Sequence, residues 1–120
     1  MKPTKNLNFL NRFKFAASGI SAAFQKESSL KTHFFAVMCL IVSCVYFKPR
    51  PIWCALFAAV SVLVIGLEMV NSAVEAFLDH TYPDFDPTVK YVKDVLAGAV
   101  LVASFGALIV FGIYVFTISK

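Results

Sequence analysis

Apolar residues dominate three long segments of the chain, and short polar connections separate them. The segments run from about residue 30 to 47, from 52 to 78 and from 94 to 118. A transmembrane helix needs about 20 mainly apolar residues, since each residue adds about 1.5 Å and the hydrocarbon core is about 30 Å thick. Two prolines in the connection Lys48-Pro-Arg-Pro51 predict a tight hairpin between the first two segments. The pattern therefore predicts an all-α integral membrane fold with three transmembrane helices.

A fourth helix is predicted ahead of the first span. Between about residues 9 and 26, apolar side chains recur at three- and four-residue spacing, at Leu10, Phe13, Ala17, Ile20 and Phe24. This spacing is typical of an amphipathic helix, which we expect to lie on the inner membrane surface; a helix packed against the spans is the alternative. Residues 1–8 are expected to form an N-terminal tail, and residues 9–120 a single membrane domain.

Composition and length agree with a membrane protein. Of the 120 residues, 59% are hydrophobic and only 15% are charged, and the mean hydropathy of +0.77 is too high for an ordinary soluble domain. The length allows one domain, but three helices cannot enclose a roomy site by themselves. We therefore expect an oligomer with its sites between subunits.

Basic residues are unevenly distributed around the spans. One side carries most of them, ahead of the first span and in the loop 79–94, at Lys2, Lys5, Arg12, Lys14, Lys26, Lys31, Lys90 and Lys93. The other side has only Lys48, Arg50 and Lys120. The positive-inside rule then places the N-terminus and the loop 79–94 in the cytoplasm, where ATP is available.

Polar residues end the second apolar segment and share one helix face. Glu68, Asn71, Ser72 and Glu75 follow the i, i+3, i+4, i+7 spacing. Counted from Ile52, Glu68 lies ~24 Å and Glu75 ~35 Å along the helix. Glu68 is therefore expected at headgroup depth and Glu75 in or near water. Ionisable groups near a bilayer are costly and usually functional.

The residue types are compatible with phosphoryl transfer and equally leave transport or assembly roles open. Glu27, Glu75 and Asp94 offer hard oxygen ligands for Mg²⁺, and Lys93 is a compact cation suited to a phosphate. Glu68 could act as a base for a lipid hydroxyl. Known nucleotide motifs of soluble kinases and dehydrogenases are absent from the sequence. A small proton-coupled exporter or an assembly subunit remains an alternative, although such an exporter usually has four spans and one carboxylate in mid-membrane.

The cysteines and histidines lack the spacing of metal ligands. All three cysteines lie in apolar surroundings and are expected to be inert, although a Cys44–Cys54 bridge across the outer end of the hairpin is an alternative. His33 is expected to make a polar contact at the membrane interface.

The longest motif resembles a known family. Glu68-Met-Val-Asn-Ser-Ala-Val-Glu75, followed by Asp79 and by Val92-Lys-Asp94, is similar to the pattern of the prokaryotic diacylglycerol kinase and undecaprenol kinase family. That pattern is Glu-x-x-Asn-(Ser/Thr)-Ala-(Ile/Val)-Glu, with Ala-Lys-Asp further along the chain, so that Val92 is a mild departure. The resemblance extends from about Phe13 to Phe116.

The resemblance implies a lipid kinase that forms a homotrimer in the bacterial cytoplasmic (inner) membrane, with active sites shared between neighbouring subunits. It implies ATP as cosubstrate, Mg²⁺ as cofactor, a membrane lipid alcohol as acceptor, and no nucleic-acid partner. Glu68 matches the base that takes the proton of the lipid hydroxyl, and Glu27 and Glu75 match the metal ligands. The remaining matches are nucleotide or phosphate contacts at Asn71, Lys93 and Asp94, an aromatic near the adenine at Phe15, a nucleotide-contacting segment at Asp84, Phe85 and Asp86, and lipid headgroup contacts at Lys31 and Ala97.

Departures from the family pattern concern the nucleotide and the lipid. Asp86 stands where His is usual, Ser18 where a basic residue is common, and Asn8 where Arg is frequent. The segments Glu27-Ser-Ser-Leu-Lys-Thr-His33 and Ile52-Trp-Cys-Ala55 are similar to undecaprenol kinases. We expect diacylglycerol as acceptor, with undecaprenol as the alternative, because both lipids offer a primary hydroxyl.

Overall fold

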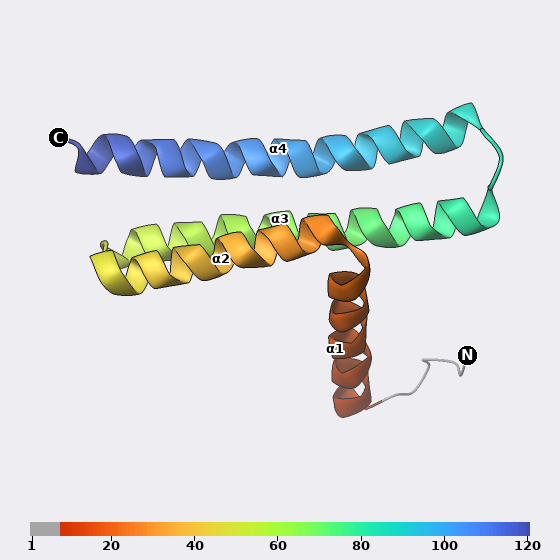
Figure 1. Cartoon of the computed structure of the whole chain (residues 1–120), viewed down its shortest axis with the longest axis horizontal. Coiled ribbons are helices and arrows are strands. Elements are labelled where there is room, and N and C mark those ends of the chain that lie inside the picture. The colour runs from red at the N-terminus through yellow and green to blue at the C-terminus, as the bar shows by residue number, and fades with distance from the viewer. Residues whose placement is uncertain (1–7) are drawn as a thin grey trace.

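The computed structural model describes residues 8–120, and this part of the chain is all-helical (Figure 1). It contains α1 (Phe9–Lys26), α2 (Ser28–Phe47), α3 (Pro51–Thr81) and α4 (Pro87–Ile118). The last three helices are long and apolar enough to cross a membrane, which confirms the prediction of three such helices. The predicted tail lies outside the described residues except for Asn8, and so do Lys2 and Lys5.

Local sequence determines where the helices begin and end. Lys48 ends α2 in the left-handed conformation, with φ 50° and ψ 55°, and Pro51 occupies the first turn of α3. Proline fits there because the first-turn N–H groups have no partner within the helix. The predicted hairpin is therefore a short turn that reverses the chain between α2 and α3.

Helix α4 begins well before the third apolar segment because a side chain caps it. The carboxylate of Asp86 accepts hydrogen bonds from the backbone N–H groups of Thr88, at 2.8 Å, and Val89, at 3.3 Å. Pro87 follows at the first helical position. An Asp cap with Pro after it is a common start for a helix, since it satisfies N–H groups that lack a partner within the helix.

The three long helices lie side by side, with α2 and α4 each packed against α3 (Figure 1). Aromatic rings pack together near the hairpin end of the bundle. Phe57 is buried there, and its ring centroid lies 5.2 Å from that of Tyr114 in an edge-to-face arrangement. Ala103 is buried in the middle of α4, and small side chains of this kind allow close helix packing. At the opposite end, α3 and α4 continue past the point where α2 begins.

Helix α1 turns away from the bundle at a steep angle (Figure 1). The turn occurs at Glu27, whose extended backbone (φ −104°, ψ 116°) separates α1 from α2. Phe24 meets Phe34 edge to face at 5.2 Å, which anchors the end of α1 on α2. The predicted helix over residues 9–26 is thus confirmed as a helix, while its place on a membrane surface stays a prediction.

Candidate active site

Polar side chains lie along the second half of α3, where the start of α2 contacts it at Glu68 and the first turns of α4 contact it further on, at Asp79. The motif residues of α3 lie on this stretch, and Glu68, Asn71 and Glu75 are all half-buried. Two interhelical contacts organise the region. One joins α2 to α3 at Glu68, and the other joins α3 to α4 at Lys93.

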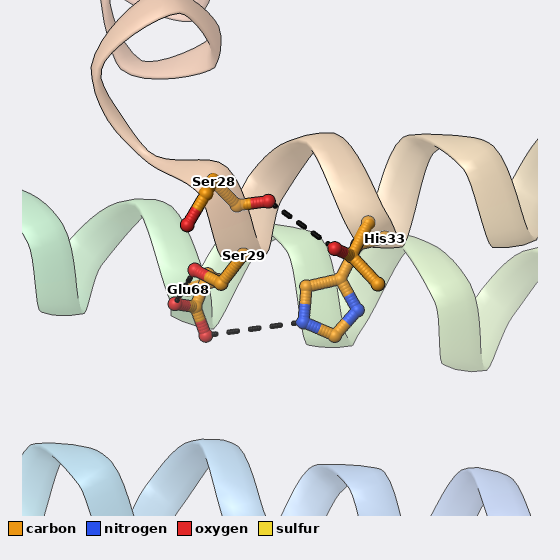
Figure 2. A network of polar contacts seen from close by, with 5 residues as sticks. Ser28, Ser29, His33 and Glu68 are labelled. Atoms are coloured by element: carbon orange, nitrogen blue, oxygen red, sulfur yellow. Dashed lines mark hydrogen bonds and ion pairs between the residues drawn. The ribbon is translucent and has the colours of Figure 1, made fainter.

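The Glu68 carboxylate is held by the first turns of α2 (Figure 2). Ser29 Oγ donates a hydrogen bond of 2.7 Å to Glu68 Oε1, and His33 Nε2 lies 4.0 Å from Glu68 Oε2. The Glu68 side chain is only 12% exposed. A hydrogen bond to an ionised carboxylate is among the stronger polar contacts in proteins. One oxygen is therefore fixed, while the other makes no hydrogen bond to the described part of the chain.

Ser29 is a contact that sequence reasoning missed. Ser29 and His33 are four residues apart on α2 and so lie on the same helix face. This spacing was available as a signal, but it did not show that the face would turn toward Glu68. The sequence predicts a polar contact for His33 at the membrane interface, and in the structure its imidazole lies beside the Glu68 carboxylate.

Asn71 presents a buried acceptor without a donor. Its Oδ1 atom is inaccessible to solvent and has no hydrogen-bond partner among residues 8–120. Buried amide oxygens are nearly always satisfied, so an unsatisfied one points to a group that arrives from outside the chain. Asn71 follows Glu68 by three residues on the same face of α3, which is the arrangement that the sequence predicts.

Lys93 joins the polar ends of α3 and α4. Its Nζ atom donates a hydrogen bond of 2.5 Å to Asp79 Oδ1. Lys93 belongs to the polar turns that open α4, ahead of the apolar stretch starting at Val95. The hydrogen bond to Asp79, together with the negative charges of Asp79 and Glu75, raises the pKa of Lys93. The lysine is therefore a full cation beside two carboxylates, and Asp79 is a partner that was not among the predicted site residues.

The other predicted residues of α4 have different surroundings. Asp94 accepts a hydrogen bond of 2.6 Å from Lys90, one turn earlier on the same helix, and both side chains are mostly exposed. Ala97 lies one turn beyond Lys93 and is exposed, as is Lys31 on α2. These residues are accessible to a ligand, and no described contact joins them to Glu68.

The predicted nucleotide contacts lie on separate elements. Phe15 is exposed on α1, and Asp84 and Phe85 are exposed in the loop between α3 and α4. Neither phenylalanine belongs to an aromatic pair within the described chain. Asp86 differs, because its carboxylate caps α4. An Asp followed by Pro is a capping signal, so the sequence itself contains the information for this cap.

Comparison with known proteins identifies the family. Residues 14–116 match the family described as prokaryotic diacylglycerol kinase. This chain belongs to the prokaryotic diacylglycerol kinase family. It is thus a member of a family of lipid kinases, as the motif on α3 and α4 predicted.

Individual members of this family are similar to the chain over most of its length. A diacylglycerol kinase of Synechocystis sp. is 35% identical over 106 residues, which are 88% of this chain and 61% of the relative. A diacylglycerol kinase of Helicobacter pylori is 26% identical over 120 residues, covering 97% of this chain and 93% of the relative. One of Haemophilus influenzae is 27% identical over 102 residues, covering 85% of this chain and 86% of the relative. The chain therefore spans about three-fifths of the Synechocystis relative and nearly all of the Helicobacter relative.

The diacylglycerol kinase family implies a divalent metal, and the carboxylates of the chain fit one. Residues 8–120 contain no cluster of three or more His, Cys, Asp or Glu side chains that could hold a metal alone. Mg²⁺, however, usually takes one or two carboxylates and completes its shell with phosphates and water. Glu27 and Glu75 are both half-buried, and neither carboxylate is hydrogen-bonded or ion-paired within the described chain. Each carboxylate is therefore free to bind a metal ion.

An apolar groove begins at His33, whose Nε2 atom lies 4.0 Å from the Glu68 carboxylate. It has a volume of about 560 Å³ and is lined by α2, α3 and α4. His33 contributes to one end, and most of the other lining side chains are apolar, including Leu40, Val64 and Leu108. A second cavity of about 390 Å³ lies between α2 and α3, where Cys44 and Cys54 both line it as free thiols. The first groove gives an apolar chain a path to the neighbourhood of the Glu68 carboxylate.

Proposed function

We propose that this protein transfers the γ-phosphoryl group of ATP to the primary hydroxyl of a membrane lipid, and that diacylglycerol is the acceptor, giving phosphatidic acid. Membership in a family of lipid kinases supports the reaction class. The observation that carries the proposal is the Glu68 carboxylate, which Ser29 holds beside His33, a residue that lines an apolar groove.

In this mechanism Glu68 takes the proton of the lipid hydroxyl, and the resulting oxygen attacks the γ-phosphorus in line. The bond from the γ-phosphorus to the β–γ bridging oxygen breaks, and ADP leaves. Oε2 suits proton transfer because it makes no hydrogen bond within residues 8–120. A general base has to come within about 2.6–3.2 Å of the proton donor's oxygen, so the lipid hydroxyl would have to approach Oε2 to that distance. Direct transfer requires no phosphoenzyme, since positioning and charge stabilisation supply most of the catalysis of phosphoryl transfer.

Cationic and metal-binding groups offset the charge of the phosphates. Lys93 would exchange its bond to Asp79 for a phosphate oxygen and stabilise the charge that develops during transfer. Glu27 and Glu75 would hold Mg²⁺, which when bound would offset part of the negative charge of the phosphates. Asn71 would direct its unsatisfied Oδ1 atom toward the bound nucleotide or its metal.

The nucleotide would extend from these groups toward the loop and α1. Phe15 offers an exposed ring for the adenine, and Asp84 and Phe85 offer exposed contacts from the loop. Asp94 is accessible and would contribute after it releases Lys90. Asp86 would act by fixing the loop through its cap on α4. The nucleotide site would therefore combine residues of α1, of the loop between α3 and α4, and of the first turns of α4.

The lipid would approach from within the bilayer. Its tail would lie in the groove that starts at His33, while Lys31 and Ala97 would face the headgroup region. Helix α1 would lie on the inner surface of the bacterial cytoplasmic membrane, with the N-terminus and the loop 79–94 in the cytoplasm. A homotrimer with sites shared between subunits would cover part of the apolar surface that α2, α3 and α4 leave exposed.

Undecaprenol is a second candidate acceptor, because the start of α2 favours it. The segment from Glu27 to His33 is similar to undecaprenol kinases, and it is this segment that contacts Glu68. Membership in a kinase family favours an enzyme over the alternative of a non-enzymatic transporter or assembly subunit.

Phosphate transfer from labelled ATP tests the proposal. Purified protein in mixed micelles would be offered diacylglycerol and undecaprenol separately, with Mg²⁺ present. Labelled phosphatidic acid, formed faster than undecaprenyl phosphate, is the expected result. Preferential labelling of undecaprenol would make undecaprenol the acceptor in place of diacylglycerol. No labelling of either lipid by folded protein would contradict the kinase proposal.

A further inference from the structure

Glu68 receives its one hydrogen bond within residues 8–120 from a residue 39 positions earlier in the chain. Ser29 Oγ, on the first turn of α2, donates to Glu68 Oε1 at 2.7 Å (Figure 2). Neighbouring polar groups do not share this contact. His33 Nε2 lies 4.0 Å from Oε2, which is beyond hydrogen-bonding distance, and the hydroxyl of Ser28 makes no described bond to Glu68.

We infer that Ser29 is a positioning residue for the reaction, which fixes the Glu68 carboxylate so that Oε2 faces the lipid hydroxyl. The inference deepens the proposed function and rests on the role of Glu68 as the base. Ser29 would not touch the reacting atoms. It would act through the carboxylate alone.

The geometry gives the hydroxyl a defined effect. A carboxylate on a long side chain can rotate about its terminal bonds, and a short bond to Oε1 removes that freedom. Both side chains belong to helices, so the bond joins two rigid elements and not two loops. Oε2 is then the oxygen that lies on the side of His33 and of the groove. A base that is misdirected by about 1 Å can lose roughly a hundredfold in rate.

A purely structural role for Ser29 predicts a different outcome. If the bond only joins α2 to α3, its loss would loosen the helix pair and impair ATP binding and turnover together. If the bond orients the base, its loss would lower kcat and leave the KM for ATP unchanged, because the nucleotide contacts lie on other residues. Ser28 supplies a matched control, since it is the adjacent serine and its hydroxyl makes no side-chain hydrogen bond within residues 8–120, while its backbone carbonyl accepts one from Thr32 Oγ1 at 3.2 Å.

The test compares Ser29→Ala, Ser29→Thr and Ser28→Ala with the unmodified protein and with Glu68→Gln, in one lipid-phosphorylation assay. Helicity and elution in detergent establish that each variant is folded. We expect Ser29→Ala to lower kcat by about 10- to 100-fold with the KM for ATP within about twofold of normal. Ser29→Thr keeps the hydroxyl and should restore most of the rate, while Ser28→Ala should resemble the unmodified protein.

Three results would overturn the inference while leaving the proposed function intact. One is an unchanged kcat in folded Ser29→Ala together with an inactive Glu68→Gln variant. Another is an equal loss in Ser29→Ala and Ser28→Ala. The third is a loss of kcat in Ser29→Ala with a matching rise in the KM for ATP, as a purely structural role predicts. If Ser29→Ala fails to fold, Ser29→Cys decides in its place, because it keeps the side-chain size and weakens the donor; activity equal to that of Ser29→Thr would contradict the inference. Turnover that persists in Glu68→Gln would remove the base role, and the inference with it.

Discussion

Lys93 on α4 donates a 2.5 Å hydrogen bond to Asp79 on α3, and the bond joins the two helices at their polar ends. The lysine side chain is 35% exposed, so a phosphate can reach it without a rearrangement of the helices. The carboxylate therefore holds the cation near Glu75 before any nucleotide arrives. This arrangement ties Glu75, the proposed metal ligand, and Lys93, the proposed phosphate contact, to one local structure.

Replacing Asp79 with Ala should weaken nucleotide binding. Lys93 would lose its fixed position, and ordering a long side chain on binding costs about 0.5–1.5 kcal/mol. The expected result is a rise of roughly two- to tenfold in the KM for ATP, measured in the lipid-phosphorylation assay. Asp79→Asn retains an acceptor oxygen and should give a smaller rise. An unchanged KM in Asp79→Ala would show that Asp79 does not prepare Lys93 for ATP.

Replacing Lys93 with Met should reduce the chemical step itself. A single donor that stabilises charge in a transition state is worth about a hundredfold to a thousandfold in kcat. Single-turnover measurement at saturating ATP should show a loss of this size. Lys93→Arg keeps the positive charge and should retain more activity than Lys93→Met. Equal rates in the two variants would argue against an electrostatic role.

Replacing Asp86 with Ala should destabilise the start of α4. The carboxylate caps two backbone N–H groups, and loss of such a cap costs about 1 kcal/mol. Unfolding in mixed micelles should show a decrease of about this size in the free energy of unfolding. Asp86→Asn can still accept these hydrogen bonds and should remain close to the unmodified protein. If the free energy of unfolding of Asp86→Ala equals that of the unmodified protein, the cap does not stabilise the helix.

Removal of divalent metal should abolish lipid phosphorylation, and Mg²⁺ should restore it. The Glu75→Gln variant loses one of two proposed carboxylate ligands, so we expect it to require at least about tenfold more Mg²⁺ for half-maximal activity. Titration of activity with Mg²⁺ at fixed ATP provides the measurement. A normal Mg²⁺ requirement in this variant would remove Glu75 from the proposed metal site.

The sequence predicts the helices well because apolar length and proline placement are local properties. Three long apolar segments and the hairpin before Pro51 correspond to α2, α3 and α4. The start of α4 at Pro87 can also be predicted from the sequence, since Asp86 and Pro87 form a capping signal. The direction of α1 relative to the other helices cannot be predicted from the sequence, because it depends on the extended backbone at Glu27 and on the contact between Phe24 and Phe34.

The candidate site is predictable in its residue types more than in its contacts. Periodicity places Glu68, Asn71 and Glu75 on one face of a helix, as the structure has them. The bond from Ser29 to Glu68 joins residues 39 positions apart and depends on how α2 rotates against α3. Helical periodicity within one segment contains no information about that rotation. For the same reason, Asp79 could not be paired with Lys93 in advance.

The central claim is that Glu68 is the base of a lipid kinase, and the rate of phosphate transfer in Glu68→Gln tests it most directly. The amide has nearly the same size and can still accept a bond from Ser29, but it cannot take the proton of the lipid hydroxyl. We predict that turnover of diacylglycerol falls to background while the variant remains folded and still binds ATP. Turnover close to that of the unmodified protein would contradict the claim.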